Sequence, residues 1–189
     1  MTMAKDAALM TADEFEVAPV QFAELIRGRM VVREPPTDLH GAVVARLIYL
    51  LGAYVYPRRA GVVMGEAGFR IESHPDTVRA PDIAFVSGDR DIAFRERGFG
   101  AYAPDLAIEV RAPTDRSGEL IAKVADWLRA GVHIVWVVDP VRGSAQIYDA
   151  GGDVRVVSVD GTLDGGDVLP GFVCMLADAL DTGRPMHRG

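Results

Sequence analysis

Pro104-Asp-Leu-Ala-Ile-Glu-Val110 reads as a buried strand, and a second apolar run, Ile134-Val-Trp-Val-Val138, follows one helix length later. Pro113 ends the first strand, and the helical pattern between the two runs stops at Gly131. A continuous apolar run is typical of a strand that is covered on both faces of a sheet. The order strand, helix, strand therefore predicts a right-handed parallel crossover at the centre of the fold.

Alternation along Leu106–Val110 divides this strand into two faces. Leu106, Ile108 and Val110 share one face, and Glu109 lies on the other with Arg111 just beyond it. A carboxylate is costly to bury without a partner. We therefore expect Glu109 to belong to a functional site or, alternatively, to form a salt bridge with Arg111 or another arginine.

Periodicity and turn residues predict the remaining elements on either side of this unit. The predicted elements are a short helix at 11–16, a β-hairpin at 22–26 and 29–32, a helix at 38–56, strands at 61–64, 69–72 and 80–86, a surface loop at 87–103, a hairpin at 145–148 and 154–159, and a loop or short strand then a small helix within 163–180. The fold class is α/β, with a mixed β-sheet flanked by helices and an N-terminal β-hairpin. We expect one domain over residues 11–181, with flexible tails at 1–10 and 182–189.

Composition limits the class of protein. The 189 residues carry a net charge of −7 and one cysteine, Cys174, so an intrachain disulfide is excluded. No continuous apolar run reaches the roughly 18 to 20 residues that span a bilayer, and no signal peptide is recognisable. We expect a cytoplasmic protein without a membrane partner. The charge argues against indiscriminate nucleic-acid coating but not against a nuclease, because a bound cation reverses the local field.

Asp82 is the carboxylate that can meet Glu109. It opens the predicted strand at 80–86, and adjacent strands lie only about 5 Å apart. Asp105 lies on the same strand as Glu109, roughly 13 Å away, and cannot share one ion with it. Asp82, Glu109 and the carbonyl of Val110 would suit magnesium, which prefers oxygen ligands and keeps several waters. Taken alone, an aspartate after a proline is more typical of a turn.

Lys123 is unusual in this chain. Of its 20 basic residues only Lys5 and Lys123 are lysine, and the other 18 are arginine. A compact ammonium can approach a metal-bound oxygen or lose its proton, which arginine cannot do. Arg111 could hold a phosphate, but its guanidinium cannot act as a general base. We therefore expect Lys123 to orient or activate a water molecule.

The chain resembles the Uma2 family of restriction-endonuclease-like proteins from about residue 11 to 181. The matching motifs, in order, are Glu24-Leu-Ile-Arg-Gly28, Pro35-Pro36 followed by His40, Arg79-Ala-Pro-Asp-Ile-Ala-Phe-Val86, Pro104-Asp-Leu-Ala-Ile-Glu-Val110 with Pro113, Lys123 with Trp127 and Ala130-Gly-Val132, Val135-Trp-Val-Val-Asp-Pro140, and Gly161-Thr-Leu-Asp-Gly-Gly-Asp-Val-Leu-Pro-Gly-Phe172.

This resemblance implies the PD-(D/E)xK nuclease fold and magnesium-dependent cleavage of DNA, with manganese as a substitute. It assigns Asp82 and Glu109 as metal ligands, Lys123 as a displaced catalytic lysine and Glu24 as a further acidic member of the site. His40 would lie at the mouth of the site, near the substrate. Resemblance also implies a homodimer or a higher homo-oligomer.

Arg111 departs from the superfamily pattern, because it occupies the usual lysine position two residues after Glu109. Two hypotheses follow. The first is a metal-dependent endodeoxyribonuclease, and the second is a catalytically silent module of the same fold that binds a metal or a protein partner. An RNA or branched-DNA substrate is not separable from DNA on sequence grounds.

Overall fold

The main sheet of the computed structural model, which describes residues 9–90, 92–93 and 95–183, is built around the predicted crossover. Strands β7 and β8 pair in parallel, with Leu106 opposite Ile134 and Val110 opposite Val138, whereas every other neighbouring pair in this sheet is antiparallel. The strand order is β10-β9-β8-β7-β6-β3. The bounds are β3 (Gly61–Gly65), β6 (Ile83–Ser87), β7 (Leu106–Val110), β8 (Ile134–Asp139), β9 (Ser144–Asp149) and β10 (Val154–Ser158).

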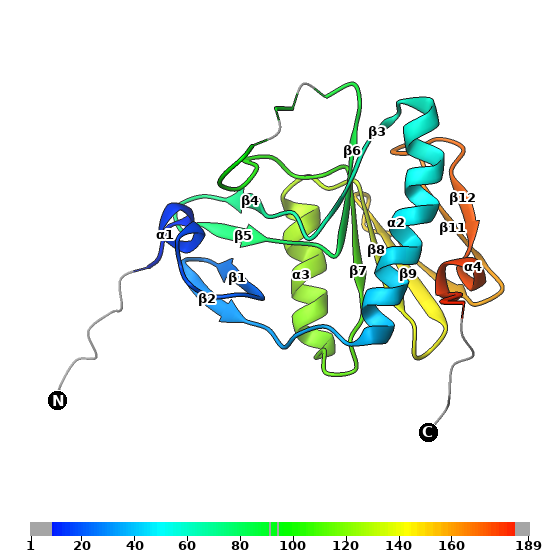
Figure 1. The fold of residues 1–189 in the computed structure, drawn as a ribbon, viewed down its shortest axis with the longest axis horizontal. Coiled ribbons are helices and arrows are strands. Elements are labelled where there is room, and N and C mark those ends of the chain that lie inside the picture. Colours follow the sequence, from blue (N-terminus) through cyan, green and yellow to red (C-terminus); the bar gives the residue numbers. More distant parts are fainter. Residues whose placement is uncertain (1–8, 91, 94, 184–189) are drawn as a thin grey trace.

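A second, smaller sheet lies beside the first, as Figure 1 shows, in the order β2-β1-β5-β4. Its bounds are β1 (Ala23–Ile26), β2 (Arg29–Val32), β4 (Phe69–Glu72) and β5 (Thr77–Arg79). The β1–β2 hairpin turns at Arg27 and Gly28, both with positive φ, as a type I′ two-residue turn requires. A Cβ at Gly28 would lie 2.6 Å from Leu9 Cβ, so this position needs glycine. Strands β11 (Thr162–Asp164) and β12 (Val173–Met175) form a separate pair.

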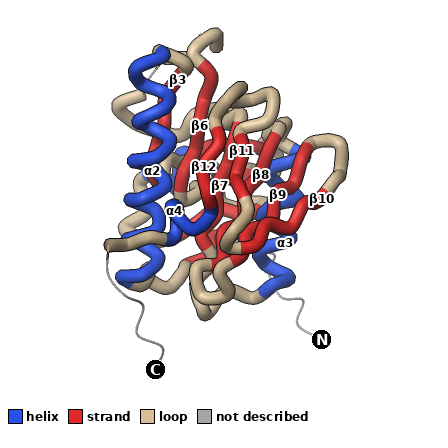
Figure 2. The backbone as a smooth tube through the Cα atoms, turned by 90° about the vertical axis from the view of Figure 1, so that its right-hand side faces the viewer, coloured by secondary structure: helices blue, strands red, loops and turns tan. Residues whose placement is uncertain are grey.

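Helices cover both faces of the main sheet (Figures 1 and 2). Helix α2 (Asp38–Arg58) packs on one face, where Leu47, Ile108 and Trp136 lie in one core cluster. Helix α3 (Ser117–Arg129) packs on the other face, where Trp127 belongs to a second cluster. The shorter helices are α1 (Ala12–Glu16) and α4 (Leu176–Leu180). The two faces of β7 therefore serve two cores, as the alternation predicted.

Helix α2 is long and apolar enough to cross a membrane by length and composition, and it is the one such helix among the described residues. The sequence pattern did not predict a helix of this kind, because no continuous apolar run in the chain is long enough to span a bilayer. Val43, Leu47, Leu51 and Val55 are fully buried against the sheet, so much of its apolar character serves the core.

The structure confirms most predicted elements and changes their limits. Helix α2 continues through Pro57 to Arg58, and the strand expected at 80–86 begins only at Ile83. The three-residue strand β5 was not predicted, because it is too short to show a periodic pattern. The C-terminal segment holds two short strands before its helix.

The outer parts of the expected tails, residues 1–8 and 184–189, lie outside the described residues. Met10 N donates a hydrogen bond to Gly28 O at 2.9 Å. The packed part of the chain therefore begins before residue 11.

Replacing Ile108 with alanine is expected to lower the free energy of unfolding by about 2 to 5 kcal/mol, because Ile108 is fully buried in the α2-side core. The same change at Ile121, which is 59% exposed on α3, is expected to change it by less than about 0.5 kcal/mol. Urea denaturation of both variants tests this pair. Equal losses would contradict the packing described for β7.

Candidate active site

The predicted site residues converge where the C-terminal end of β7 meets the N-terminal halves of α2 and α3 and the small sheet (Figure 1). Glu24 comes from β1, His40 from α2, Asp82 from the residue before β6, Glu109 from β7 and Lys123 from α3. Their side chains form one chain of close polar contacts, apart from the step between Asp82 and Glu109, which is electrostatic.

The Lys123 ammonium lies at the centre of the cluster and is 7% exposed. It donates to Glu109 Oε2 at 2.7 Å and to Ala80 O at 3.0 Å, and its Nζ lies 3.1 Å from Glu24 Oε1. These three acceptors match the three donors of an ammonium. Helix α3 therefore returns across the sheet and brings Lys123 to Glu109, as the connectivity suggested.

Glu109 is held through both carboxylate oxygens. Oε2 contacts Lys123, and Oε1 accepts a hydrogen bond from Trp127 Nε1 at 2.8 Å. Lys123 and Trp127 are four residues apart and share the buried face of α3. Trp127 thus belongs to the α3-side core and also makes a polar contact with the site. The alternative salt bridge between Glu109 and Arg111 is not among the contacts of the described residues.

Glu24 is the most heavily paired carboxylate of the cluster and is 4% exposed. Its Oε2 accepts from Arg33 Nη2 at 2.6 Å and from Arg79 Nη1 at 2.8 Å, and its Oε1 accepts from Ala80 N at 3.3 Å. With Lys123, Arg33 and Arg79 it forms a buried ion network.

Sequence reasoning missed the outer part of this network. Arg79 is 3% exposed and bridges Glu24 to Asp126, donating from Nε to Asp126 Oδ2 at 3.1 Å and from Nη2 to the same oxygen. Asp126 lies one helical turn after Lys123. That spacing, which places both side chains on one side of α3, was the available signal.

Asp82 contacts the end of β7 rather than Glu109 directly. Its Oδ2 accepts from Val110 N at 2.6 Å and lies 3.2 Å from His40 Nε2. The other ring nitrogen of His40, Nδ1, is buried and has no hydrogen-bond partner among the described residues. The Asp82 side chain is 20% exposed, so this part of the cluster opens toward solvent.

Arg111 points away from the cluster centre. It donates from Nη2 to Ser117 Oγ at 2.9 Å, and its Nη1 lies 3.6 Å from Asp139 Oδ2. These contacts tie the end of β7 to the start of α3 and the end of β8. Its predicted contact with substrate stays a prediction.

Burial and the opposite charges set the protonation of the cluster. Burial favours a neutral Lys123, but Glu109, Glu24 and Asp82 outweigh it and raise the pKa of Lys123 above its ordinary value. Burial would also raise the pKa of Glu24, but Lys123, Arg79 and Arg33 together lower it to about 2. Lys123 is therefore a firmly protonated ammonium beside an ionised Glu24.

Glu109 and His40 have pKa values raised for different reasons. Burial raises the pKa of Glu109 to about 7, against the opposing effect of Lys123. The hydrogen bond with Asp82 raises the pKa of His40. Both groups can therefore change charge more easily near neutral pH than Glu24 or Lys123.

A model of the Uma2 family, described as "Putative restriction endonuclease", matches residues 12–179. The chain belongs to the Uma2 family. It is also similar to a crystal structure titled as a "putative nuclease belonging to DUF820" from Anabaena variabilis, with 21% identity and a TM-score of 0.80 over 92% of this chain and 98% of that one. No curated protein matches the chain. The restriction-endonuclease-like α/β fold expected from the sequence is thereby confirmed.

Asp82, Glu109 and the Val110 carbonyl offer oxygen donors, which are the kind that a hard divalent cation prefers. The Asp82 carboxylate already contacts the His40 imidazole, a group that carries positive charge when protonated, and the Val110 N–H. Across residues 9–90, 92–93 and 95–183, no three His, Cys, Asp or Glu side chains are arranged as a metal cluster. Magnesium commonly binds through one or two carboxylates and keeps several waters, so a full set of side-chain ligands is not required of such a site.

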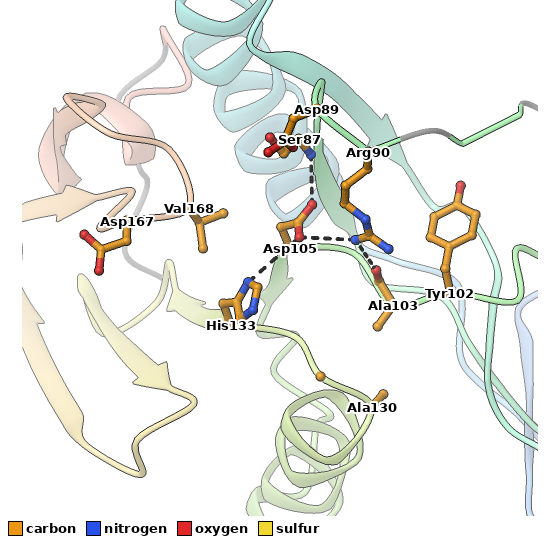
Figure 3. A pocket seen from close by; sticks show the side chains of 11 residues that line it. Ser87, Asp89, Arg90, Tyr102, Ala103, Asp105, Ala130, His133, Asp167 and Val168 are labelled. Carbon is orange, nitrogen blue, oxygen red and sulfur yellow. Dashed lines mark hydrogen bonds and ion pairs between the residues drawn. The ribbon is translucent and has the colours of Figure 1, made fainter.

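A cavity of about 540 Å³ lies at the opposite end of β7 and contains none of the predicted site residues (Figure 3). Asp105 lines it, and its carboxylate accepts from Ser87 N at 2.8 Å and from Arg90 Nη1 at 3.2 Å. These contacts give Asp105 a structural role in the Uma2 chain. The separation of Asp105 from the Glu109 cluster agrees with the sequence argument from strand rise.

Acid titration of Glu24 provides a test of the ion network. Because the pKa of Glu24 falls from 4.5 to about 2 on folding, its ionisation stabilises the protein by about 3 kcal/mol above pH 4.5, and this contribution is lost as the pH falls toward 2. We expect Glu24→Gln to be less stable than wild type by about that amount at pH 7, and by less than half of it at pH 3. Urea denaturation at several pH values measures both.

The matched control is Glu34→Gln, since Glu34 is exposed on the chain segment after β2. The free energy of unfolding of Glu34→Gln should equal that of wild type at every pH measured. A constant difference between Glu24→Gln and wild type from pH 7 to pH 3 would contradict the assigned ionisation.

Proposed function

We propose that this Uma2 chain is a metal-dependent endonuclease that hydrolyses phosphodiester bonds of DNA. The observation that carries the proposal is the convergence of Asp82, Glu109 and Lys123 from three separate elements at one end of the main sheet. The family match supports nuclease chemistry in general. Magnesium, the substrate and the roles of individual residues belong to the proposal.

Asp82, Glu109 and the Val110 carbonyl would hold the cation. Bound magnesium, or manganese in its place, would lower the pKa of an attacking water and neutralise charge on the phosphate. Asp82 is the more accessible ligand, because its carboxylate is partly exposed while its Oδ2 is oriented by Val110 N. Glu109 would have to exchange a hydrogen-bonding partner for the ion, since both its oxygens are in use.

Lys123 would act as a charged donor in this mechanism. Its raised pKa and its three acceptors oppose the loss of a proton, so of the two roles considered the orienting one fits better. Glu24 would be a positioning residue, because it reaches the site through the Lys123 ammonium. Together they would fix one donor beside the Glu109 carboxylate.

His40 and Arg111 would contact the substrate from the solvent side. His40 Nε2 lies against the Asp82 carboxylate, where an incoming phosphate would meet the ligand set. Arg111 retains 21% exposure while bound to Ser117 and could turn one edge of its guanidinium to a phosphate. We further propose a cytoplasmic location, on the sequence features given above.

The second candidate is a module of the same fold without turnover. Arg111 in place of the usual lysine, engaged with Asp139, favours it, as does a Glu109 carboxylate whose oxygens are already hydrogen bonded. Such a protein would bind a cation or a protein partner without cleaving nucleic acid.

Supercoiled plasmid DNA incubated with the protein and magnesium or manganese is expected to be nicked. Asp82→Asn should reduce the rate at least about 100-fold, because it removes a ligand charge at the proposed metal site while keeping the shape of the side chain. Asp167→Asn, at an exposed aspartate beside the cavity at the opposite end of β7, is the matched control and should cleave as wild type does. Single-stranded, branched and RNA substrates in the same assay define the preference.

Cleavage by Asp82→Asn at the wild-type rate, or cleavage in the presence of a chelator, would refute the site assignment. Absence of cleavage on all substrates by a folded protein that still binds magnesium would establish the silent module instead.

Isothermal titration with magnesium separates binding from catalysis. Wild type is expected to bind the ion, and Asp82→Asn is expected to bind it at least tenfold more weakly, because one of two carboxylate ligands becomes a neutral amide. Asp167→Asn should bind as wild type does. Equal affinity in all three proteins would place the cation elsewhere.

A further inference from the structure

Arg33 is the cation through which the buried ion network reaches the surface. Its side chain is 31% exposed, whereas those of Arg79 and Lys123 are buried. Its Nε and Nη2 atoms both donate to Glu24 Oε2, at 3.0 and 2.6 Å. Nη1 has no hydrogen-bond partner among the described residues. A guanidinium carries N–H donors on every edge of a planar fork, so this free edge is available to an acceptor from solvent.

The Arg33 guanidinium lies beside the proposed metal ligands. Burial lowers the pKa of Arg33, but the carboxylates of Glu24, Glu109 and Asp115 outweigh burial and raise it. Asp115 belongs to the connection between β7 and α3. Figure 1 shows the chain leaving β2 near the start of α3 and running on to α2. A phosphate bound at the free edge of Arg33 would therefore lie close to the proposed site of the cation.

Phe22 is the cross-strand neighbour of Arg33. Its carbonyl accepts a hydrogen bond from Arg33 N at 2.6 Å, which extends the β1–β2 register by one pair beyond Ala23 and Val32. The φ of Phe22 is 52°, a left-handed conformation that bulky residues seldom adopt. Its ring is 48% exposed and belongs to none of the hydrophobic clusters of the described chain. Packing therefore does not account for this backbone conformation, and such conformations are concentrated at ligand sites.

Exposed apolar side chains continue along the same hairpin. Val20 lies just before β1, and Val31 and Val32 lie on β2. Val31 pairs with Glu24, so these two side chains share the face of the hairpin that meets the site. An aromatic ring with apolar neighbours binds the flat face of a nucleobase by stacking. In a duplex these faces are already stacked on one another, so only an unpaired nucleotide offers one.

We propose that Arg33 and Phe22 form a subsite for an unpaired strand of DNA at the mouth of the candidate active site. Arg33 binds one phosphate through the free edge of its guanidinium, and Phe22 stacks on the adjacent base. The inference rests on the proposed nuclease function and names its substrate class, which is DNA with exposed bases in single strands, flaps or open junctions. Fully paired DNA is the poorer substrate.

Charge near the subsite favours one strand over two. Glu34 is exposed next to Arg33, and Asp38 is exposed at the start of α2. A duplex carries phosphates on two strands, and its binding depends on several basic side chains along the backbone. The carboxylates of Glu34 and Asp38 would repel a second strand. A purely apolar partner would cover the free edge of Arg33 and leave its donors without an acceptor, which is costly.

Fluorescence anisotropy with a labelled single-stranded oligonucleotide and its matching duplex tests the subsite. Both DNAs are titrated with the full chain in the presence of a chelator, so that binding is measured apart from cleavage. Wild type is expected to bind the single strand at least about tenfold more tightly than the duplex. Phe22→Ala should weaken binding of the single strand about tenfold, because one base loses its stacking partner, and should leave binding of the duplex unchanged.

Arg33→Gln should weaken binding of the single strand and reduce the slope of log affinity against log salt concentration by about 0.7, the value for one phosphate. Loss of packing alone would not change this slope. Arg33→Lys should restore the slope but not the full affinity, because an ammonium lacks the planar fork. The matched controls are Arg29→Gln, at an exposed arginine of β2, and Val17→Ala, at an exposed valine after α1, and both should bind as wild type does. Circular dichroism checks that every variant folds.

Three results would overturn this inference even if the chain nicks plasmid DNA. They are equal affinity of wild type for the two DNAs, no binding of either DNA, and binding by Phe22→Ala and Arg33→Gln that equals that of wild type. Conversely, tighter binding of the single strand that depends on Phe22 and Arg33 would support the subsite even if no substrate is cleaved. In that case only the proposed nuclease activity would fail.

Discussion

The rest of the site depends on the contacts of one group, the buried Lys123 ammonium. It joins α3 to Glu109 on β7, to Glu24 on β1 and to the carbonyl of Ala80. Removing a charge from water is expensive unless partners replace the solvent. The fold meets that cost by bringing the small sheet, the main sheet and one helix to a single point. The small sheet is thereby attached to the site as well as to the core.

Local patterns were sufficient to predict the parts of the fold that depend on them. Alternation along β7 predicted that Glu109 and Ile108 lie on different faces of the strand. The rarity of lysine in the chain drew attention to Lys123. The partnership of Arg79 with Asp126 was not predicted, because it joins residues 47 positions apart, and the spacing of Asp126 from Lys123 indicated only that these two side chains lie on one side of α3. Strand β5 was not predicted, because a strand of three residues is too short to show a periodic pattern. Asp82 was placed correctly beside β7, but its contact with the backbone N–H of Val110 required the coordinates.

The three carboxylates of the cluster lie in different environments. Glu24 is surrounded by cations and has a lowered pKa, which makes it a structural anion. Burial is the largest influence on the pKa of Glu109 and raises it, although Glu109 contacts the same ammonium. Asp82 lies nearer to solvent. One cluster thus contains a fixed charge on Glu24, a titratable carboxyl group on Glu109 and a more exposed carboxylate on Asp82.

The side chain of Trp127 connects the α3-side core to the site, because it packs in that core and is hydrogen bonded to Glu109. The indole N–H contacts the carboxylate, while the ring packs edge-on against Phe69 at 6.2 Å between centroids. Indole emission responds to nearby charge, so a change in the ionisation or ligation of Glu109 would alter the fluorescence of Trp127. Trp136, on the opposite face of the sheet, would report mainly on the other core. The chain therefore contains a built-in optical probe of its own candidate active site.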